Sequence, residues 1–135
     1  MKIVSSAQLE SLFQQAELSP RKRIHLNLHT SFGDKVQRLY IAMLKGSYVE
    51  PHYHELPHQW EMFFVLQGEI RLKLYNVDGS VKESMLIGVG HEVQSIELHP
   101  SDIHSVECIS DRALLVEIKE GPFNPELAKV FPNWQ

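Results

Sequence analysis

Apolar and polar residues alternate along most of the chain after its first twenty residues. Ile24, Leu26 and Leu28 are separated by polar residues, and this period of two is typical of a half-buried β-strand. Further strands are predicted at residues 36–44, 47–54, 60–67, 70–75, 81–87, 92–98, 104–109 and 113–119. Many short strands joined by turns predict an all-β sandwich or barrel.

The first residues follow a helical pattern instead. Ser5 and Gln8 have the spacing of a capping box, in which a serine side chain accepts from the backbone at the helix start. Apolar residues then recur at helical spacing at Leu9, Leu12, Phe13 and Ala16. Because Ser19-Pro20 breaks the pattern, we predict a short helix and turn over residues 1–18.

Glycine-containing turns punctuate the strands. Lys45-Gly46 separates two of them, and Gly68 predicts a hairpin between residues 60–67 and 70–75. The run from Asn76 to Gly79 is a strong turn signal. Residues 120–135 look irregular, with one helical turn at 126–130. We find no repeat or linker, and expect residues 1–135 to form a single domain.

Composition narrows the functional classes. The chain has 43% apolar and 22% charged residues and a formal charge of −4, which gives no basic surface for nucleic acid or an anionic membrane. No apolar run approaches the ~20 residues that span a bilayer. The start of the chain has no apolar signal region, so we expect a cytoplasmic protein. Cys108 lies in an apolar alternating stretch and is predicted to be a buried hydrophobic residue.

The most specific chemical pattern is a pair of histidines, His52 and His54, separated by one residue. On a strand, residues i and i+2 point to the same face, so both imidazoles can reach one point in space. Glu61 and His104 on neighbouring strands would add a carboxylate and a third imidazole. Such a set suits a borderline divalent metal.

The spacing around these histidines resembles the first motif of the cupin superfamily. Gly46, His52-x-His54, Glu61 and Gly68 follow that motif, although the gap before the glutamate is longer than usual. The register with Gly68 selects Glu61 over His58, which lies four residues after His54. The second motif survives as His104 with the apolar Val106 two residues later, and its usual glycine position falls on Ser101. The resemblance implies a double-stranded β-helix, the jelly-roll barrel of cupins, with a short N-terminal helix.

A narrower resemblance covers residues 19 to 135. The matching stretches are Ser19-Pro20-Arg21, Arg23, Asn27-x-His29, Gln37-Arg38-Leu39, Ser47-Tyr48-x-x-Pro51-His52-x-His54, Glu117-x-Lys119-x-Gly121-Pro122-Phe123-x-Pro125, Lys129 and Trp134. This joint pattern resembles the WbuC family of bacterial cupin-fold metalloproteins. The resemblance implies a bound divalent metal, and some members lie in gene clusters for surface-polysaccharide synthesis. The family carries no assigned reaction.

Three imidazoles and one carboxylate leave two positions open on an octahedral ion. A metal there could polarise a carbonyl, as an isomerase or epimerase requires. Iron in the same site could activate dioxygen. Imidazole and carboxylate ligands can bind Fe, Mn, Ni, Co or Zn, so the ligand types do not identify the metal.

Polar residues outside the ligand set are candidates for substrate binding and proton transfer. Arg23, His25, Asn27 and His29 share one face of a strand. This face is either a solvated edge or, through Asn27, His29 and Arg38, one wall of the metal cavity. An arginine there could bind a carboxylate or phosphate with two hydrogen bonds. His29 and His58 are the histidines we expect as general bases, because imidazole titrates near neutrality. His58 has two other readings, a solvated loop residue or a replacement ligand.

Two functions remain open from the sequence. The first is a metal-dependent enzyme acting on a small polar, sugar-derived substrate in surface-polysaccharide synthesis. The alternative is a non-catalytic cupin that binds or senses a small molecule. Since cupins commonly pair through strands, the resemblance also implies a homodimer.

Overall fold

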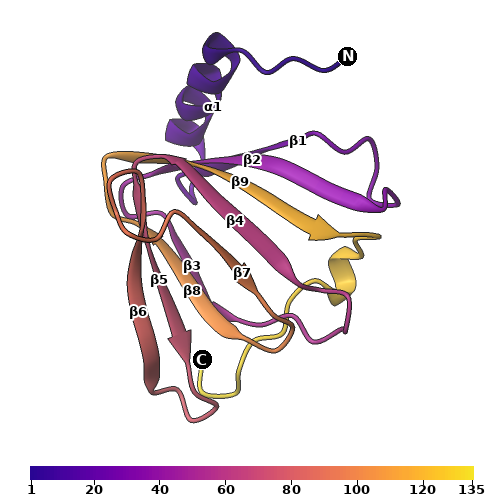
Figure 1. Ribbon diagram of the computed structural model, residues 1–135, viewed down its shortest axis with the longest axis vertical. Coiled ribbons are helices and arrows are strands. Elements are labelled where there is room, and N and C mark those ends of the chain that lie inside the picture. Colours follow the sequence, from indigo (N-terminus) through magenta and orange to yellow (C-terminus); the bar gives the residue numbers. More distant parts are fainter.

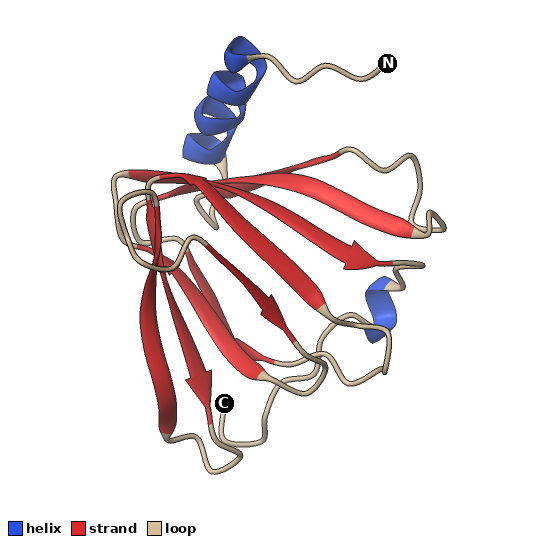
Figure 2. Ribbon diagram, in the orientation of Figure 1, coloured by secondary structure: helices blue, strands red, loops and turns tan.

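Two antiparallel β-sheets face each other in the computed structural model, which describes residues 1–135 (Figures 1 and 2). The five-stranded sheet has the order β1 (Arg23–Asn27), β2 (Val36–Leu44), β9 (Arg112–Glu120), β4 (Glu61–Gln67) and β7 (Ser95–Leu98). The four-stranded sheet has the order β3 (Tyr48–His52), β8 (Ile103–Cys108), β5 (Glu69–Tyr75) and β6 (Val81–Gly88). The predicted all-β, jelly-roll fold with a short N-terminal helix is confirmed.

Successive strands often cross from one sheet to the other, and this corrects one prediction. The segments on either side of Gly68 do not form a hairpin: β4 pairs with β7 and β9, whereas β5 pairs with β6 and β8. Gly68 has a φ of +74°, and a Cβ there would meet the carbonyl oxygen of Arg112 at 2.1 Å. The glycine therefore permits a sharp reversal between the sheets where β9 starts. The true hairpin is β5–β6, across the predicted turn that ends at Gly79.

The core lies between the sheets and is built from the inward faces of their strands. The largest side chains with almost no exposure are Met43, Ile70, Leu72, Ile87 and Leu115. Cys108 belongs to the same cluster, and burial raises the pKa of its thiol to about 11. The cysteine is thus a buried hydrophobic residue, as predicted.

Helix α1 (Ser6–Leu18) covers the outer face of the five-stranded sheet beside β1 and β2 (Figure 1). The Ser5 side chain caps it by accepting from the Gln8 backbone at 3.2 Å. Leu12 and Phe13 pack against Ala42 of β2, with Ile24 and Leu26 of β1 at the edge of the cluster. Because β1 turns its apolar side chains toward the helix, its alternate residues face the interior of the molecule.

The last fifteen residues run along one open end of the two sheets. They contain a 3₁₀ helix, Pro125–Leu127, and Val130 pairs with Tyr53 in an antiparallel bridge. Trp134 packs against Gly79 and Tyr75. Neither helix of the chain has the length and apolarity that crossing a bilayer requires.

Candidate metal centre

The four predicted ligands converge between the sheets. His52 ends β3 and lies opposite His104 of β8 in the four-stranded sheet. His54 follows two residues later, and Glu61 opens β4 in the five-stranded sheet. One ligand atom from each of the four lies within 4.8 Å of all the others. Side chains from both sheets thus form one cluster, and three of the four are buried.

The backbone fixes which nitrogen each imidazole offers. The Nδ1 atoms of His52, His54 and His104 lie 2.8, 2.5 and 2.9 Å from the backbone carbonyl oxygens of Glu50, Ala128 and Asp102. A carbonyl only accepts, so each Nδ1 carries the hydrogen and donates it. The three Nε2 atoms are therefore the ones with a lone pair for a metal ion, and the carbonyls orient the rings as in known metal sites.

The carboxylate of Glu61 lies beside two of these nitrogens. Its Oε1 is 2.9 Å from Nε2 of His104, and its Oε2 is 3.2 Å from Nε2 of His54. Neither buried nitrogen has a hydrogen-bond partner of acceptable geometry. Two lone pairs facing a buried carboxylate repel it unless a cation lies among them. The arrangement fits a divalent metal ion bound by these residues.

The pKa shifts within the cluster also show that positive charge is favoured beside Glu61. Burial raises the pKa of Glu61, but the adjacent His104 and His54 outweigh burial and hold the pKa well below its usual range. Burial lowers the pKa of His54, yet the Glu61 carboxylate outweighs it and the net pKa is raised. Burial, reinforced by His104, lowers the pKa of His52 to about 3. His52 is therefore held in the neutral form that binds a metal.

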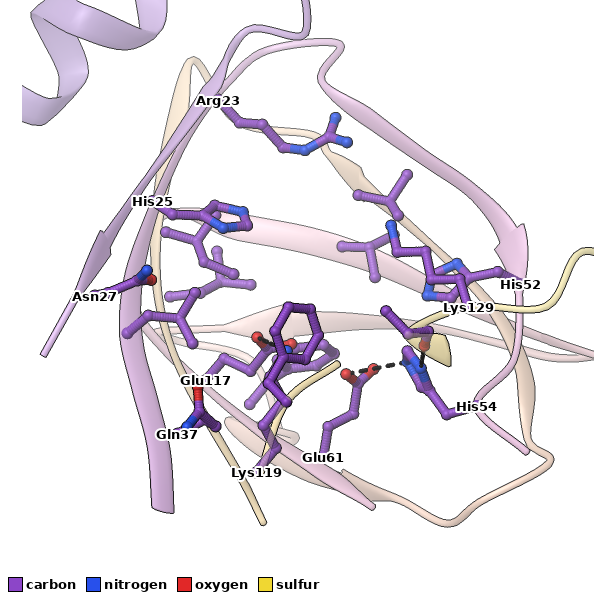
Figure 3. A pocket seen from close by; sticks show the side chains of 18 of the residues that line it. Arg23, His25, Asn27, Gln37, His52, His54, Glu61, Glu117, Lys119 and Lys129 are labelled. Atoms are coloured by element: carbon purple, nitrogen blue, oxygen red, sulfur yellow. Dashed lines mark hydrogen bonds and ion pairs between the residues drawn. The ribbon is translucent and has the colours of Figure 1, made fainter. Parts of the chain in front are cut away.

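A cavity of about 260 Å³ opens in front of this cluster (Figure 3). Arg23, His25 and Asn27 of β1 line one wall, and His29 lies just beyond them. The inward alternation of β1 thus forms a cavity wall rather than a solvated edge. The volume lies just below the range of roughly 300–1,000 Å³ typical of ligand pockets, so it suits a small molecule.

His29 lies at this wall in a fixed orientation. Its Nδ1 lies 3.1 Å from both the backbone nitrogen and the backbone oxygen of Arg38, so its ring is held by the neighbouring strand. Its Nε2 makes no hydrogen bond within the protein, and the side chain is 9% exposed. One ring nitrogen is therefore available to a ligand in the cavity.

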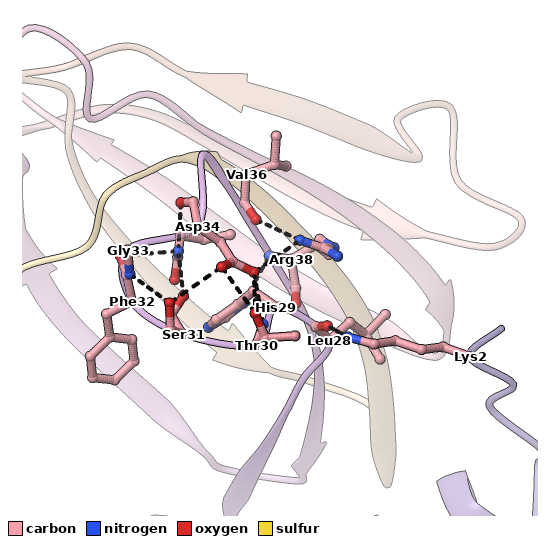
Figure 4. A network of polar contacts seen from close by, with 11 residues as sticks. Lys2, Leu28, His29, Thr30, Ser31, Phe32, Gly33, Asp34, Val36 and Arg38 are labelled. Carbon is pink, nitrogen blue, oxygen red and sulfur yellow. Dashed lines mark hydrogen bonds and ion pairs between the residues drawn. The ribbon is translucent and has the colours of Figure 1, made fainter.

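Two of the predicted site residues, Arg38 and His58, do not line the cavity. The guanidinium of Arg38 donates to the carbonyl of Val36 at 2.9 Å and lies 3.7 Å from Asp34, away from the cavity (Figure 4). The prediction that Arg38 lines the wall is wrong, because alternation along β2 points Gln37 inward and Arg38 outward. His58 lies in the loop between β3 and β4 and is not among the residues that line the cavity.

Other cavity residues were missed from the sequence. Glu117 and Lys119 of β9, Gln37 of β2 and Lys129 of the C-terminal segment all line it. Burial, reinforced by Glu61, raises the pKa of Glu117 to about 7, and its carboxylate lies 3.6 Å from the Lys119 ammonium. The alternation of Leu115, Glu117 and Lys119 was a usable signal, because these residues share the face of β9 that points inward.

A family model describes residues 4–87, more than half of the chain, as a domain of unknown function, DUF6016. The chain belongs to the DUF6016 family. No curated protein matches its sequence.

Solved structures with the same fold as this DUF6016 chain are cupin-superfamily proteins. An oxalate oxidase in complex with the substrate analogue glycolate is 16% identical, with a TM-score of 0.62 over 84% of this chain and 56% of the other. KdgF from Halomonas sp. is 13% identical, with a TM-score of 0.60 over 81% and 87% of the two chains. The capsular polysaccharide assembling protein CapF from Staphylococcus aureus is 16% identical, with a TM-score of 0.64 over 79% and 31%.

The DUF6016 chain spans little more than half the length of oxalate oxidase and about a third of CapF. At these identities the likeness establishes the cupin fold. The metal centre itself rests on the residues of this chain, four ligand side chains in front of a small polar cavity.

Proposed function

We propose that the protein is a metal-dependent enzyme that acts on a small polar substrate in the cavity. The observation that carries the proposal is that one ligand atom from each of three imidazoles and the Glu61 carboxylate lies within 4.8 Å of the others, at a cavity of about 260 Å³. A divalent ion held by His52, His54, Glu61 and His104 would supply a Lewis acid or, with iron, a site for dioxygen.

The chain's own residues supply the rest of the chemistry. The β1 wall binds and orients the substrate through Arg23 and Asn27. His29 accepts or donates a proton at Nε2, while its Nδ1 stays tied to the backbone of Arg38. Phe123 and Ala128 of the C-terminal segment line the cavity as well and restrict access of water.

A sugar-derived substrate and a link to bacterial surface-polysaccharide synthesis are the finer part of the proposal. They are supported by the resemblance to the WbuC family and by the fold shared with a capsular polysaccharide assembling protein. Assembly as a homodimer and a cytoplasmic location are predictions from the resemblance and from the sequence, and light scattering on the purified protein tests the first.

The test combines metal analysis with turnover. Anaerobically purified wild-type protein is expected to carry about one divalent ion per chain, and Glu61→Gln is expected to lose most of it together with any turnover of small sugars and sugar acids. His99→Gln is the matched control, because His99 is an exposed histidine five residues before His104. It should retain wild-type metal content and activity.

Two outcomes decide against the proposal. Full turnover in protein stripped of metal would remove the ion from the mechanism. A ligand that binds tightly and is recovered unchanged, with and without oxygen, would favour the alternative, a cupin that only binds or senses a small molecule.

A further inference from the structure

Arg23 is a buried cation without an acidic partner. Its side chain lines the cavity and only 8% of the residue is exposed. Its one hydrogen bond goes to the backbone carbonyl of Tyr48 at 3.4 Å, and none of the six ion pairs in the structure includes it. A buried guanidinium left unpaired costs stability, so a negatively charged ligand is the partner that the position lacks.

The charged side chains around the cavity are mostly positive, like Arg23. Four cationic side chains line it, against two carboxylates, although the chain as a whole carries a formal charge of −4. The cations are Arg21, Arg23, Lys119 and Lys129. Only Lys119 has an acidic partner, Glu117, while Glu61 lies among the metal ligands. The cavity is therefore electropositive even before a metal ion is counted.

Lys129 and Arg23 both line the cavity, near enough for their charges to interact. Figure 3 shows the Lys129 side chain beside His52, whereas the Arg23 side chain reaches in from β1. Partial burial, reinforced by the charge of Arg23, lowers the pKa of Lys129. Enclosure by the walls and four nearby cations lower the pKa of His25 to about 4, which reflects the same positive potential. A ligand anion between Arg23 and Lys129 would relieve this repulsion.

A second polar group in the cavity lacks a partner. The Gln37 side chain is 1% exposed, and its Nε2 donates to the backbone carbonyls of Ser31, Phe32 and Asp34 at 2.9–3.3 Å. These bonds fix the amide orientation and leave Oε1 as a buried acceptor with no hydrogen bond. The group that satisfies such an oxygen is a donor, such as a ligand hydroxyl.

We propose that the cavity binds a small hydroxylated acid, with its anionic group between Arg23 and Lys129 and a hydroxyl donating to Oε1 of Gln37. The inference rests on the proposed function, because it specifies the substrate class of the same metal cavity. The anionic group is a carboxylate or a phosphate, since an arginine fork recognises both.

Calorimetric titration of the metal-loaded protein tests this with three probes of one skeleton: glucose, glucuronate and glucose 6-phosphate. The acids are expected to bind more tightly than glucose, and the stronger of the two identifies the anionic group. Arg23→Gln should weaken binding of that acid roughly 10- to 100-fold and leave glucose unaffected. Arg71→Gln is the matched control, because Arg71 lies on β5 outside the cavity, and it should change neither.

A stability measurement separates a binding role from a structural one. Because Arg23 is buried without an acid, Arg23→Gln should raise the melting temperature of the ligand-free protein by a few degrees while it weakens acid binding. If Arg23 had only a structural role, the substitution would lower the melting temperature instead.

The two proposals fail differently. If the wild-type protein bound no metal, the proposed function would be overturned, while its preference for acids over glucose could still be measured. Equal binding of glucose and both acids, no acid binding to the metal-loaded protein, or unchanged acid affinity in Arg23→Gln would overturn the anion site alone.

Discussion

At the scale of single residues, Gly68 has a requirement that no other residue type meets. Its φ is +74°, and an added Cβ would lie 2.1 Å from the Arg112 carbonyl oxygen and 2.9 Å from the Ala113 Cα. Gly68→Ala would place a Cβ on a left-handed backbone and force it against neighbouring backbone atoms. We therefore expect a loss of roughly 2–4 kcal/mol of unfolding free energy. Urea denaturation of the variant measures it.

Gly90→Ala is the control for that experiment. Gly90 has a φ of +89°, yet a Cβ there would meet nothing within 4 Å. It should lose only the conformational part, about 1–2 kcal/mol. Equal losses in the two variants would mean that the close approach of β9 to Gly68 contributes nothing to stability.

The sequence predicted individual residues correctly where a motif fixed their spacing. It failed where a residue's direction depends on how the strands are arranged in the sheets. The spacing of His52, His54 and Glu61 anticipated a cluster that the structure brings within 4.8 Å. Ser101 also fits, because it occupies the usual glycine position of the second motif and has a φ of +75°. The direction of Arg38 could not be read from a motif, since it depends on which face of β2 meets the cavity.

At the scale of elements, strand alternation explains most of what could be predicted. The period of two in β1 separated Ile24 and Leu26 from Arg23 and His25, and the structure places the first pair near α1 and the second on the cavity. Strand bounds followed from the same pattern. The partner of each strand did not, because β4 and β5 are adjacent in sequence yet belong to different sheets, a consequence of jelly-roll connectivity.

The C-terminal segment is the element that most directly affects the metal centre. Val130 is bonded in both directions to Tyr53, at 2.9 and 3.0 Å, and this pairing keeps the Ala128 carbonyl on Nδ1 of His54. Val130→Pro removes the donor and should loosen the segment, lowering metal affinity roughly 10- to 100-fold as expected for loss of a ligand-orienting contact. A competition titration against a fluorescent chelator measures the affinity.

Val130→Ala keeps both backbone bonds and should bind metal as the wild type does. Limited proteolysis should cut the proline variant, and not the alanine variant, between residues 121 and 135. If both variants bound metal equally well, the segment would close the cavity without orienting His54.

At the scale of the whole molecule, the candidate metal centre brings together side chains from both sheets. His52, His54 and His104 come from the strands and loop end of one sheet, whereas Glu61 opens a strand of the other. An ion bound by all four therefore binds only the folded arrangement, and its binding free energy adds to the stability of the fold. At a free metal concentration about 1,000 times the dissociation constant, the gain is about 4 kcal/mol.

For a domain of this size, such a gain corresponds to a rise of roughly 10 °C or more in melting temperature. We expect this rise when chelator-treated protein is reloaded, with the largest shift for the ion that the site binds most tightly among Fe, Mn, Ni, Co and Zn. Differential scanning calorimetry on both forms measures it. Glu61→Gln cuts the link between the sheets and should show little response to the same ions, whereas His99→Gln should respond fully. An equal rise in Glu61→Gln would contradict this prediction. It would mean that the stabilising ion does not depend on Glu61, the one ligand that comes from the five-stranded sheet.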